Sequence, residues 1–366
     1  GKAITTIGDL NIGVLGQVNP RGLPGSALNV GGNLSLAGAA GDLLNLSATG
    51  AWTLDVTGTA AASYVTAAYS NAGGGTAVDA DDGTNTDGGN NVHWLFSSSV
   101  AGKLYSDEGV TPLSGKKVSV SLNGGALAGS GTTDAGGQYV IADIPFMTGG
   151  SIVTLYVDGE TDDAVTVVLG SGSAMTGISL YKNRLIVRSE TGSMAVTNAH
   201  LSAAALSAGS DADIAAIFHA SGSTLAVQVP KELFVWTGDE FAPGGQVTAT
   251  DYDINGTLTL GSNAFTVLGS WDATGGTFTT TGTGTFAVIA ATGTMTSNGS
   301  HFQNLKYTGG GTLQLLDNLN LSGALVLASG AGTFDNATYD RNITAEGNVT
   351  MDNTTVSMGD GTWTVS

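Results

Sequence analysis

The chain has 366 residues, no cysteine and a formal net charge of −19, from 30 acidic and 11 basic side chains. The lack of cysteine excludes disulfides and thiolate metal sites, and the scarcity of Lys and Arg argues against nucleic acid as a partner. Charged residues make up only 11% of the chain and hydrophobic residues 41%. This composition favours a secreted β-rich protein with a buried core, and no apolar stretch approaches the ~20 residues of a membrane span.

Residues 1–98 consist of short segments in which apolar and polar residues alternate, separated by Gly and Asn. The segments 32–36 and 52–57 are examples. Alternation with a period of two is typical of a strand with one buried face. Evenly spaced short strands with Gly corners favour stacked solenoid turns. We therefore predict a β-solenoid segment over 1–98, with its closing edge at the acidic loop and the apolar cluster 94–96.

Residues 99–185 form a separate group of longer candidate strands, at 118–122, 139–141, 152–157, 164–169 and 185–187. Turn signals rich in Asn, Asp and Gly separate several of them. We predict a small β-sandwich here. Residues 186–230 are predicted to be a connector, either part of the sandwich or a short helix. The helix candidates are 201–206 and 211–218, interrupted by Gly209 and Ser210.

Residues 231–366 show the same pattern of short alternating segments as residues 1–98. Stretches such as 256–260, 311–315 and 361–365 repeat a small polar, apolar, polar, apolar theme next to Gly. Their spacing is about 20–25 residues, in the range of solenoid repeats. The sequence thus predicts an all-β chain with a second solenoid segment over 231–366.

The segment 115–120, followed by Gly-Thr-Thr-Asp-Ala-Gly-Gly-Gln-Tyr at 131–139, resembles the carboxypeptidase-regulatory-like and Cna-B group of Ig-like modules. The resemblance covers the range of the predicted sandwich, 99–185. It implies that the sandwich is an Ig-like, seven-stranded module used as a spacer or stalk.

The flanking segments, with phrases such as Gly-Thr-Leu-Thr-Leu-Gly at 256–261, are similar to the right-handed β-helix regions of giant repetitive bacterial surface proteins and adhesins. That resemblance lies in the general repeat pattern and extends over 1–98 and 231–366. It implies right-handed β-helix segments on either side of the Ig-like module, and it brings no catalytic motif with it.

The two ends of the chain resemble neighbouring pieces of one solenoid. The segment 361–366 is similar to 50–55, and Ser366 followed by residue 1 reads as unbroken solenoid. Solenoids normally carry polar caps, and neither end has an evident one. We predict an end-to-end contact between copies, either in one longer polypeptide or between separate subunits; the alternative is an arbitrary boundary. The predicted contact residues are Gly1, Lys2, Ala3, Ile4, Thr362, Trp363, Thr364, Val365 and Ser366.

The loop at 79–91 is the densest group of oxygen ligands in the chain. Ca²⁺ prefers six to eight hard oxygens on a flexible, Gly-containing loop. The candidate ligands are Asp79, Asp81, Asp82, Asn85 and Asp87. The alternative is a run of Asx turns in which side chains bond the local backbone. Calcium is the one cofactor that the sequence suggests.

Several Asn-x-Ser/Thr motifs predict glycosylation if the chain is secreted; the alternative is Asn stacked at solenoid corners. The candidate acceptors are Asn255, Asn298, Asn320, Asn336, Asn342, Asn348 and Asn353.

No catalytic constellation is evident in the sequence. The four His are far apart, and the chain has no nucleophile elbow or phosphate-binding loop. We therefore predict a non-enzymatic, extracellular or cell-surface structural protein, the repeat unit of a filament, stalk or sheath whose partners are copies of itself. The alternatives are an adhesin that binds glycans or another cell, a polysaccharide-active β-helix enzyme, and a phage tail-fibre segment.

Overall fold

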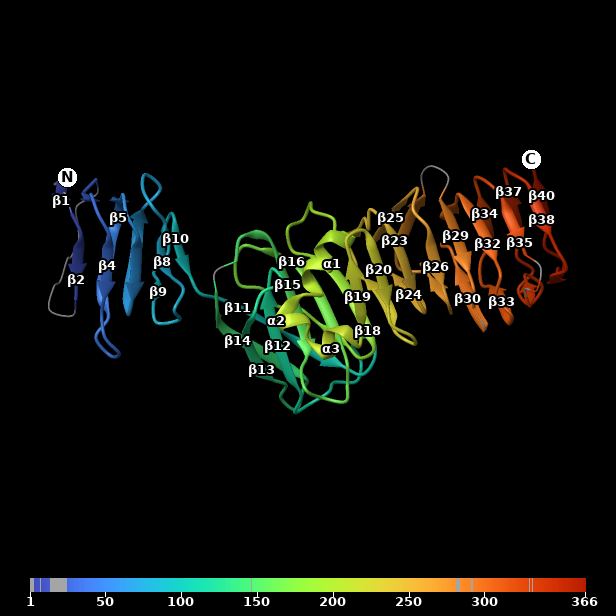
Figure 1. Cartoon of the computed structure of the whole chain (residues 1–366), viewed down its shortest axis with the longest axis horizontal. Coiled ribbons are helices and arrows are strands. Elements are labelled where there is room, and N and C mark those ends of the chain that lie inside the picture. The colour runs from blue at the N-terminus through green and yellow to red at the C-terminus, as the bar shows by residue number, and fades with distance from the viewer. Residues whose placement is uncertain are drawn as a thin grey trace. The chain divides into compact units, whose positions relative to one another are not determined.

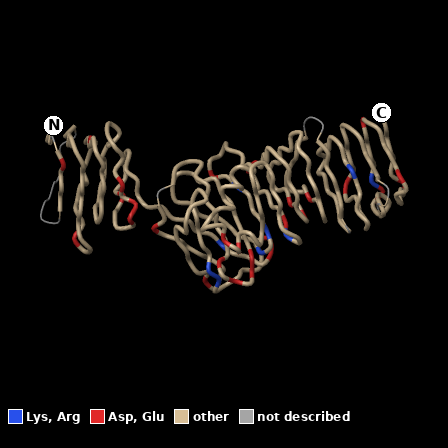
Figure 2. The backbone as a smooth tube through the Cα atoms, in the orientation of Figure 1, with Lys and Arg blue, Asp and Glu red and all other residues tan. Residues whose placement is uncertain are grey.

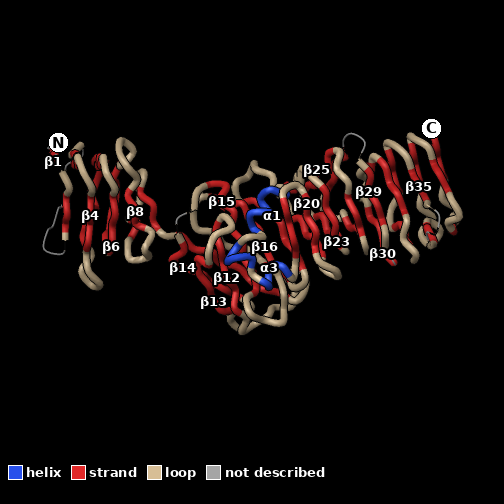
Figure 3. Tube along the Cα trace, in the orientation of Figure 1, coloured by secondary structure: helices blue, strands red, loops and turns tan. Residues whose placement is uncertain are grey.

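A computed structural model of the chain describes residues 3–6, 8–13, 25–145, 147–280, 284–290, 292–328, 330 and 332–366. Strands dominate these residues, and helices are confined to one short region (Figure 3). The strands stack as a β-solenoid, so the predicted all-β class and the predicted solenoid are confirmed. The chain divides into two compact units. Unit 1 is Gly1–Val100 with Ile141–Met147, and unit 2 is Ala101–Val140 with Thr148–Ser366.

Unit 1 contains a parallel solenoid whose strands form two five-stranded sheets, ordered β1-β3-β5-β7-β9 and β10-β8-β6-β4-β2. The long strand β5 turns a corner: its first half pairs with β7, and its second half pairs with β3 on one side and again with β7 on the other. One turn of this solenoid therefore has three strand segments. The strands are β1 (Ala3–Thr6), β2 (Leu10–Ile12), β3 (Ala27–Val30), β4 (Leu34–Ala37), β5 (Leu44–Val56), β6 (Ala60–Ser63), β7 (Val65–Asn71), β8 (Val78–Ala80), β9 (Thr86–Asp87) and β10 (Trp94–Phe96).

The alternation read from the sequence sets which side chains face the core. Along β5, the even-numbered Leu46, Trp52 and Leu54 are buried in one cluster with residues of the neighbouring turns. Burying a side chain of this size contributes about 1.5–3 kcal/mol. The odd-numbered residues of the second half face outward and are polar or small. A one-residue shift in register would reverse the two faces, so the hydrophobic pattern also specifies the register.

Unit 2 contains a second parallel solenoid, whose strands lie side by side from β18 to β40 (Figure 1). Each turn visits three faces in the same order: a long sheet of twelve strands, a third face, and a second sheet of eight strands. The third face comprises the sheets β22-β25-β28 and β31-β34-β37-β40. Equivalent positions on successive turns, such as Thr312 and Thr333, pair directly. The interval between them is the length of one turn and agrees with the predicted spacing.

The strands of the unit 2 solenoid are β18 (Arg184–Ser189), β19 (Phe218–Ser221), β20 (Thr224–Val227), β21 (Glu232–Val235), β22 (Glu240–Phe241), β23 (Gln246–Ala249), β24 (Asp251–Ile254), β25 (Thr257–Gly261), β26 (Phe265–Val267), β27 (Trp271–Asp272), β28 (Thr277–Thr280), β29 (Thr285–Val288), β30 (Thr292–Thr296), β31 (His301–Phe302), β32 (Asn304–Tyr307), β33 (Thr312–Leu315), β34 (Leu319–Leu321), β35 (Leu325–Leu327), β36 (Thr333–Asp335), β37 (Ile343–Ala345), β38 (Val349–Met351), β39 (Thr355–Ser357) and β40 (Trp363–Val365).

Glycine at the corners allows successive turns to approach closely. A Cβ added to Gly332 would lie 1.8 Å from the carbonyl oxygen of Gly311 on the preceding turn. No side chain fits at that distance, so the corner requires glycine. This requirement accounts for part of the high glycine content of the chain.

The middle of the chain forms two further groups of strands, a three-stranded sheet β14-β11-β17 and the antiparallel start of the long sheet, β13-β12-β15-β16. These seven strands fall in the region where the sequence predicts an Ig-like sandwich, and that family assignment stays a prediction. The strands are β11 (Ser98–Tyr105), β12 (Lys117–Leu122), β13 (Leu127–Thr132), β14 (Gln138–Ile144), β15 (Gly149–Val157), β16 (Val165–Ser171) and β17 (Leu180–Tyr181).

The sheet containing β15 and β16 is continuous with the solenoid, which the sequence did not indicate. Strand β16 pairs in parallel with β18, with Val165 opposite Leu185, and β18 pairs in parallel with β21. The stack of unit 2 therefore begins at β18, well before the predicted boundary at residue 231. Both faces of β16 are buried. On one face, Val167 packs in the solenoid core cluster. On the opposite face, the Thr166 hydroxyl donates a hydrogen bond to the Ser179 carbonyl.

Three short helices cover the first turn of the unit 2 solenoid (Figure 3). They are α1 (Asn198–Ala204), α2 (Ser207–Ser210) and α3 (Ala212–Ala215), so a helix in the connector is confirmed. Leu201 and Ile214 join the same core cluster as the solenoid strands. The buried Asn198 side chain donates to the carbonyls of Ser223 and Gln246. The helices thus form a cap, and none in the described ranges is long and apolar enough to cross a membrane.

Candidate functional site

The last turn of the unit 2 solenoid, formed by β38, β39 and β40, leaves its core-facing side chains uncovered. In the preceding turn, the core-facing residues Leu325, Leu327, Phe334, Ile343 and Ala345 are each at most 1% exposed. Their register partners in the last turn are Val349, Met351, Val356, Trp363 and Val365. Met351 is 49% exposed and Val365 is 56% exposed. The exposure arises because no described residue stacks on this turn.

The first described turn of unit 1 shows the same feature. Ile4 in β1 is 55% exposed, whereas its register partner Leu28 is 5% exposed and the next residue in the column, Leu54, is fully buried. Within the described residues, β1 pairs only with β3 and β2 only with β4. Each of these strands therefore has one backbone edge without a partner among those residues. Such edges are templates for the addition of another strand.

The structure places part of the predicted contact set in these two turns. Ile4 lies in β1, and Trp363, Thr364 and Val365 form β40. Trp363 is half-buried, with its ring 6.1 Å from that of Phe334. The other predicted contact residues either hydrogen-bond through their backbone N–H groups or are not fully described. The backbone N–H of Thr362 donates to Asn342, that of Ser366 donates to Ala345, Ala3 is described only as backbone in β1, and Gly1 and Lys2 lie outside the described residues.

The sequence missed Val349, Met351 and Val356, which share the exposed face of the last turn with Val365. Their local pattern is the same as that of buried strands elsewhere in the chain. Only their position in the outermost turn distinguishes them, so no sequence signal identifies them as contact residues.

Asn and Asp side chains link consecutive turns at the corners of the solenoid. The Asn318 Oδ1 accepts the backbone N–H of Asn342 at 2.9 Å, and the Asn342 Oδ1 accepts that of Thr362 at 2.8 Å. Asp9 and Asn33 make the equivalent contacts in unit 1. Corner N–H groups have no strand partner, and these side chains supply the missing acceptors. This arrangement agrees with the alternative that Asn residues stack at solenoid corners.

Replacing Asn342 with alanine is expected to lower the free energy of unfolding by about 1 kcal/mol, because the Thr362 N–H loses its acceptor. The Asn342→Asp substitution keeps an oxygen in place and is expected to retain most of that stability. Urea denaturation followed by circular dichroism measures both variants. Equal losses in the two variants would contradict the corner-acceptor role and would favour a role for Asn342 as a modified asparagine.

The candidate glycosylation residues occupy different environments. Asn336 is fully buried, and its amide donates to the carbonyls of Arg341 and Met358, so it is inaccessible in the folded chain. Asn255 donates to Asp253. Asn298 is exposed and donates to the Gly276 carbonyl. Asn320 is half-buried, whereas Asn342, Asn348 and Asn353 are exposed. Glycosylation at the accessible positions stays a prediction.

The acidic loop of unit 1 is organised by local hydrogen bonds. The Asp82 Oδ1 accepts from the Thr84 backbone and hydroxyl and from Asn85 Nδ2, and the Asp87 Oδ1 accepts from Gly89 and Asn91. The Asp79 Oδ1 accepts the backbone N–H of Asp81 in the same local manner. No three carboxylates of this loop converge within 4.8 Å of one another, although all of its residues are described. The geometry agrees with the Asx-turn alternative, and calcium binding stays a prediction.

An unpredicted charged cluster lies on the outer face of the long sheet in unit 2. Arg184 in β18 pairs with Glu108 at 2.6 Å, and its Nε lies 3.0 Å from a Glu232 carboxylate oxygen. Asp253 in β24 completes a group of three carboxylates with oxygens within 4.8 Å of one another. Burial, followed by the charges of Glu108, Glu232 and Asp272, raises the pKa of Asp253 to about 7. Burial also raises the pKa of Glu232.

The Asp253→Asn variant is expected to be more stable than the original chain at pH 8, by roughly 2 kcal/mol. An acid whose folded pKa is raised costs nothing below its unfolded pKa, near 4. Its cost grows as pH rises toward 7 and is constant above that. The stability advantage of the variant should therefore appear between pH 4 and pH 7. Thermal unfolding at pH 3.5, 5.5 and 8 measures it, and a pH-independent difference would contradict this assignment.

Aromatic side chains beside this cluster join the middle strands to the solenoid within unit 2. The Tyr181 ring lies 6.0 Å from that of Tyr105 and 5.4 Å from that of Phe234. The Arg188 guanidinium lies 4.7 Å from the centre of the Trp236 ring. These rings pack against one another between β11, β17 and β21, so the aromatic side chains here serve packing.

Basic side chains gather in the same part of unit 2, and most are paired with acids. Seven of the eleven lie between residues 103 and 231, a concentration visible in Figure 2. Asp162 accepts from both Lys116 and Lys182, and these hydrogen bonds hold the pKa of Asp162 below its usual range. A second group of carboxylates, Asp158, Asp211 and Asp213, adjoins Lys117, which contacts Asp158 at 2.8 Å. Most of the positive charge is therefore used in internal ion pairs.

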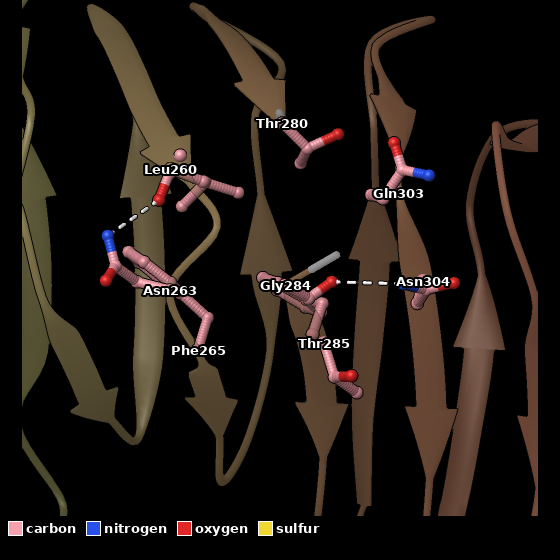
Figure 4. A pocket seen from close by; sticks show the side chains of 10 residues that line it. Leu260, Asn263, Phe265, Thr280, Gly284, Thr285, Gln303 and Asn304 are labelled. Atoms are coloured by element: carbon pink, nitrogen blue, oxygen red, sulfur yellow. Dashed lines mark hydrogen bonds between the residues drawn. The ribbon is translucent and has the colours of Figure 1, made fainter. Parts of the chain in front are cut away.

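Two hollows of unit 2 are too small for a typical ligand. The first lies beside β26, β29 and β32 (Figure 4) and has a volume of ≈ 10 Å³, room for about one water. Asn263 and Asn304 on its wall donate to backbone carbonyls. The second is a polar hollow of ≈ 210 Å³ lined in part by Met194, Asp239 and Glu240. Both are smaller than the roughly 300–1,000 Å³ of typical small-molecule sites.

Comparison of the chain with protein-family models, with curated proteins and with solved structures gives no match.

Proposed function

We propose that this chain is a structural repeat unit of an extracellular filament, stalk or sheath, in which copies join head to tail through the turns at the ends of their solenoids. The observation that carries the proposal is the exposed core-facing row of the last turn. Its residues are apolar and aligned with a buried row, yet Met351 and Val365 are about half exposed. A further turn stacked on this one would bury them in the same way as Leu327 and Ala345.

The terminal strands lack the features that keep sheet edges apart. Soluble proteins protect exposed edges with Lys, Pro, bulges or inward charges. The sequences of β38, β39 and β40 are Val-Thr-Met, Thr-Val-Ser and Trp-Thr-Val, without charge or proline. Each offers an unprotected parallel edge on one face of the same turn. These features support pairing with another solenoid turn.

The remainder of the chain suits a passive, load-bearing role outside the cell. Its low content of charged residues and its lack of cysteine are compatible with a surface protein whose stability comes from a regular core. The net charge of −19 would keep parallel fibres from clumping side by side. In this proposal the strands β11–β17 are an Ig-like spacer set between two solenoid segments.

Sedimentation velocity over a range of protein concentrations tests the proposal. Copies that join end to end should give species that grow with concentration, because heterologous contacts of this kind do not close. In a tandem polypeptide the same contact would form at a higher effective concentration, so separate copies still report on it. A single-chain species at every concentration up to the millimolar range would overturn the proposal.

A further inference from the structure

We infer that the turn formed by β38 and β39 in one copy receives the first turn, β1 and β2, of a second copy in parallel register, with β1 on β38 and β2 on β39. This inference rests on the proposed function and specifies its interface.

The direction follows from the pairing of turns throughout both solenoids. The rung-to-rung strand pairs given for the described residues are parallel, from β1 with β3 to β37 with β40. A strand added to β38 in the same manner must therefore run parallel to it and must belong to the leading turn of another stack. The leading turn of the unit 2 solenoid is covered by α1 and α3, whose Leu201 and Ile214 fill its core. The leading turn of unit 1, by contrast, has an edge on β1 and on β2 that no described strand covers.

The register follows from which side chains face the core. Ile4 and Thr6 lie in the core-facing columns of Leu28 and Val30, and Val349 and Met351 lie in those of Leu325 and Leu327. Matching the two core-facing columns sets Ile4 against Val349 and Thr6 against Met351. The outward-facing Thr5 then lies opposite the outward-facing Thr350. Both threonines are exposed in the isolated chain.

The second pair of strands is compatible with the same placement. Val356 in β39 is core-facing and half-buried, as is Leu10 in β2. The first residues of β1 and β2 are seven positions apart along the chain, and those of β38 and β39 are six apart. One copy can therefore engage both edges at once. Exposed apolar groups of both copies, Ile4 in β1 of one and Met351 in β38 of the other, would be buried together.

Disulfide cross-linking tests this interface directly, because the chain has no cysteine of its own. One preparation carries Thr5→Cys and the other carries Thr350→Cys. Neighbouring strands lie about 4.7–4.9 Å apart, within the Cα separation of about 4.4–6.8 Å that a disulfide needs. Mild oxidation of the mixture is expected to give a covalent dimer, and each preparation alone is expected to stay uncross-linked. Val326→Cys, outward-facing on β35 one turn inside, replaces Thr350→Cys in the control and should give no dimer with Thr5→Cys.

Sedimentation of the same samples separates failure of the register from failure of the assembly. Association without a Thr5–Thr350 cross-link would overturn the inferred pairing and leave the proposed function standing. Cross-linking of Thr350→Cys with itself would show that two last turns meet each other, which also overturns the pairing. Absence of both association and cross-link would overturn the pairing and the proposed function together.

Discussion

Replacing Trp271 with alanine is expected to lower the free energy of unfolding of the unit 2 solenoid by about 3–5 kcal/mol. Trp271 is 1% exposed and lies at the centre of an aromatic cluster. Its ring centre is 5.2 Å from that of Tyr252 and 4.7 Å from that of Phe286. Removal leaves a cavity that parallel strands pinned on both sides cannot close. Urea denaturation followed by circular dichroism measures the loss.

Trp236→Ala is the matched control for this prediction. The Trp236 ring lies outside the solenoid core, half-buried beneath Arg188. Its loss removes a cation–π contact and some packing, which we expect to cost about 1–2 kcal/mol. Similar effects of the two substitutions would contradict the assignment of Trp271 to a closely packed core. If only Trp236→Ala lowered the free energy of unfolding strongly, unit 2 would be stabilised mainly by the contacts between the middle strands and the solenoid.

The double substitution Met351→Lys with Val365→Lys is expected to weaken association between copies by at least about 100-fold while leaving the folded chain intact. Both side chains are about half exposed in the isolated chain, so lysine can extend into water at little cost. In a stacked assembly the same two positions face the core, where an unpaired charge costs several kcal/mol. Sedimentation velocity gives the association, and thermal unfolding gives the stability.

Thr350→Lys with Thr364→Lys is the control with matched charge. These residues lie on the same two strands, β38 and β40, but point outward. They are expected to change association by less than about tenfold, and the change should be sensitive to salt because the charges stay in water. Equal loss of association in both double variants would contradict the view that the core-facing row makes the contact.

The strands of this fold could be predicted because the sequence pattern that specifies each strand lies within the strand and its neighbouring residues. The alternation in residues 52–57 predicts β5, and its even-numbered residues are buried as the period requires. The Gly corners and the regular spacing of the strands predict stacked turns. The interruption of the helix near Gly209 was also predicted, and Ala208 and Gly209 have positive φ there. These features depend on residues close in sequence, for which composition and period are sufficient evidence.

Features that depend on distant segments could not be predicted. The pairing of Val165 with Leu185 joins the middle strands to the solenoid, but an apolar strand reads the same whether its sheet ends or continues. The capping role of α1 depends on Asn198, whose partners Ser223 and Gln246 lie far along the chain. The raised pKa of Asp253 arises from its burial and from Glu108, Glu232 and Asp272, which come from different segments.

The candidate site was predicted only in part, for the same reason. Trp363 and Val365 were predicted as contact residues because they resemble residues 52–54. Val349 and Met351 were not predicted, because their exposure depends only on their place in the outermost turn and their sequence is that of an ordinary buried strand. In the acidic loop, composition alone indicated calcium, but the Asp82 and Asp87 carboxylates accept local N–H groups. Asx turns and cation sites use the same residue types, so geometry is needed to separate them.

We propose that the solenoid continues from one copy into the next, and cryo-electron microscopy of the assembled chains tests this most directly. We expect a fibre with one axial repeat per chain, in which stacked strands continue through each junction at the ordinary separation of about 4.7–4.9 Å. We also expect β1 to lie next to β38 at the junction. Fibres in which copies meet through the middle strands β11–β17, or junctions in which the last turn faces solvent, would contradict a continuous solenoid.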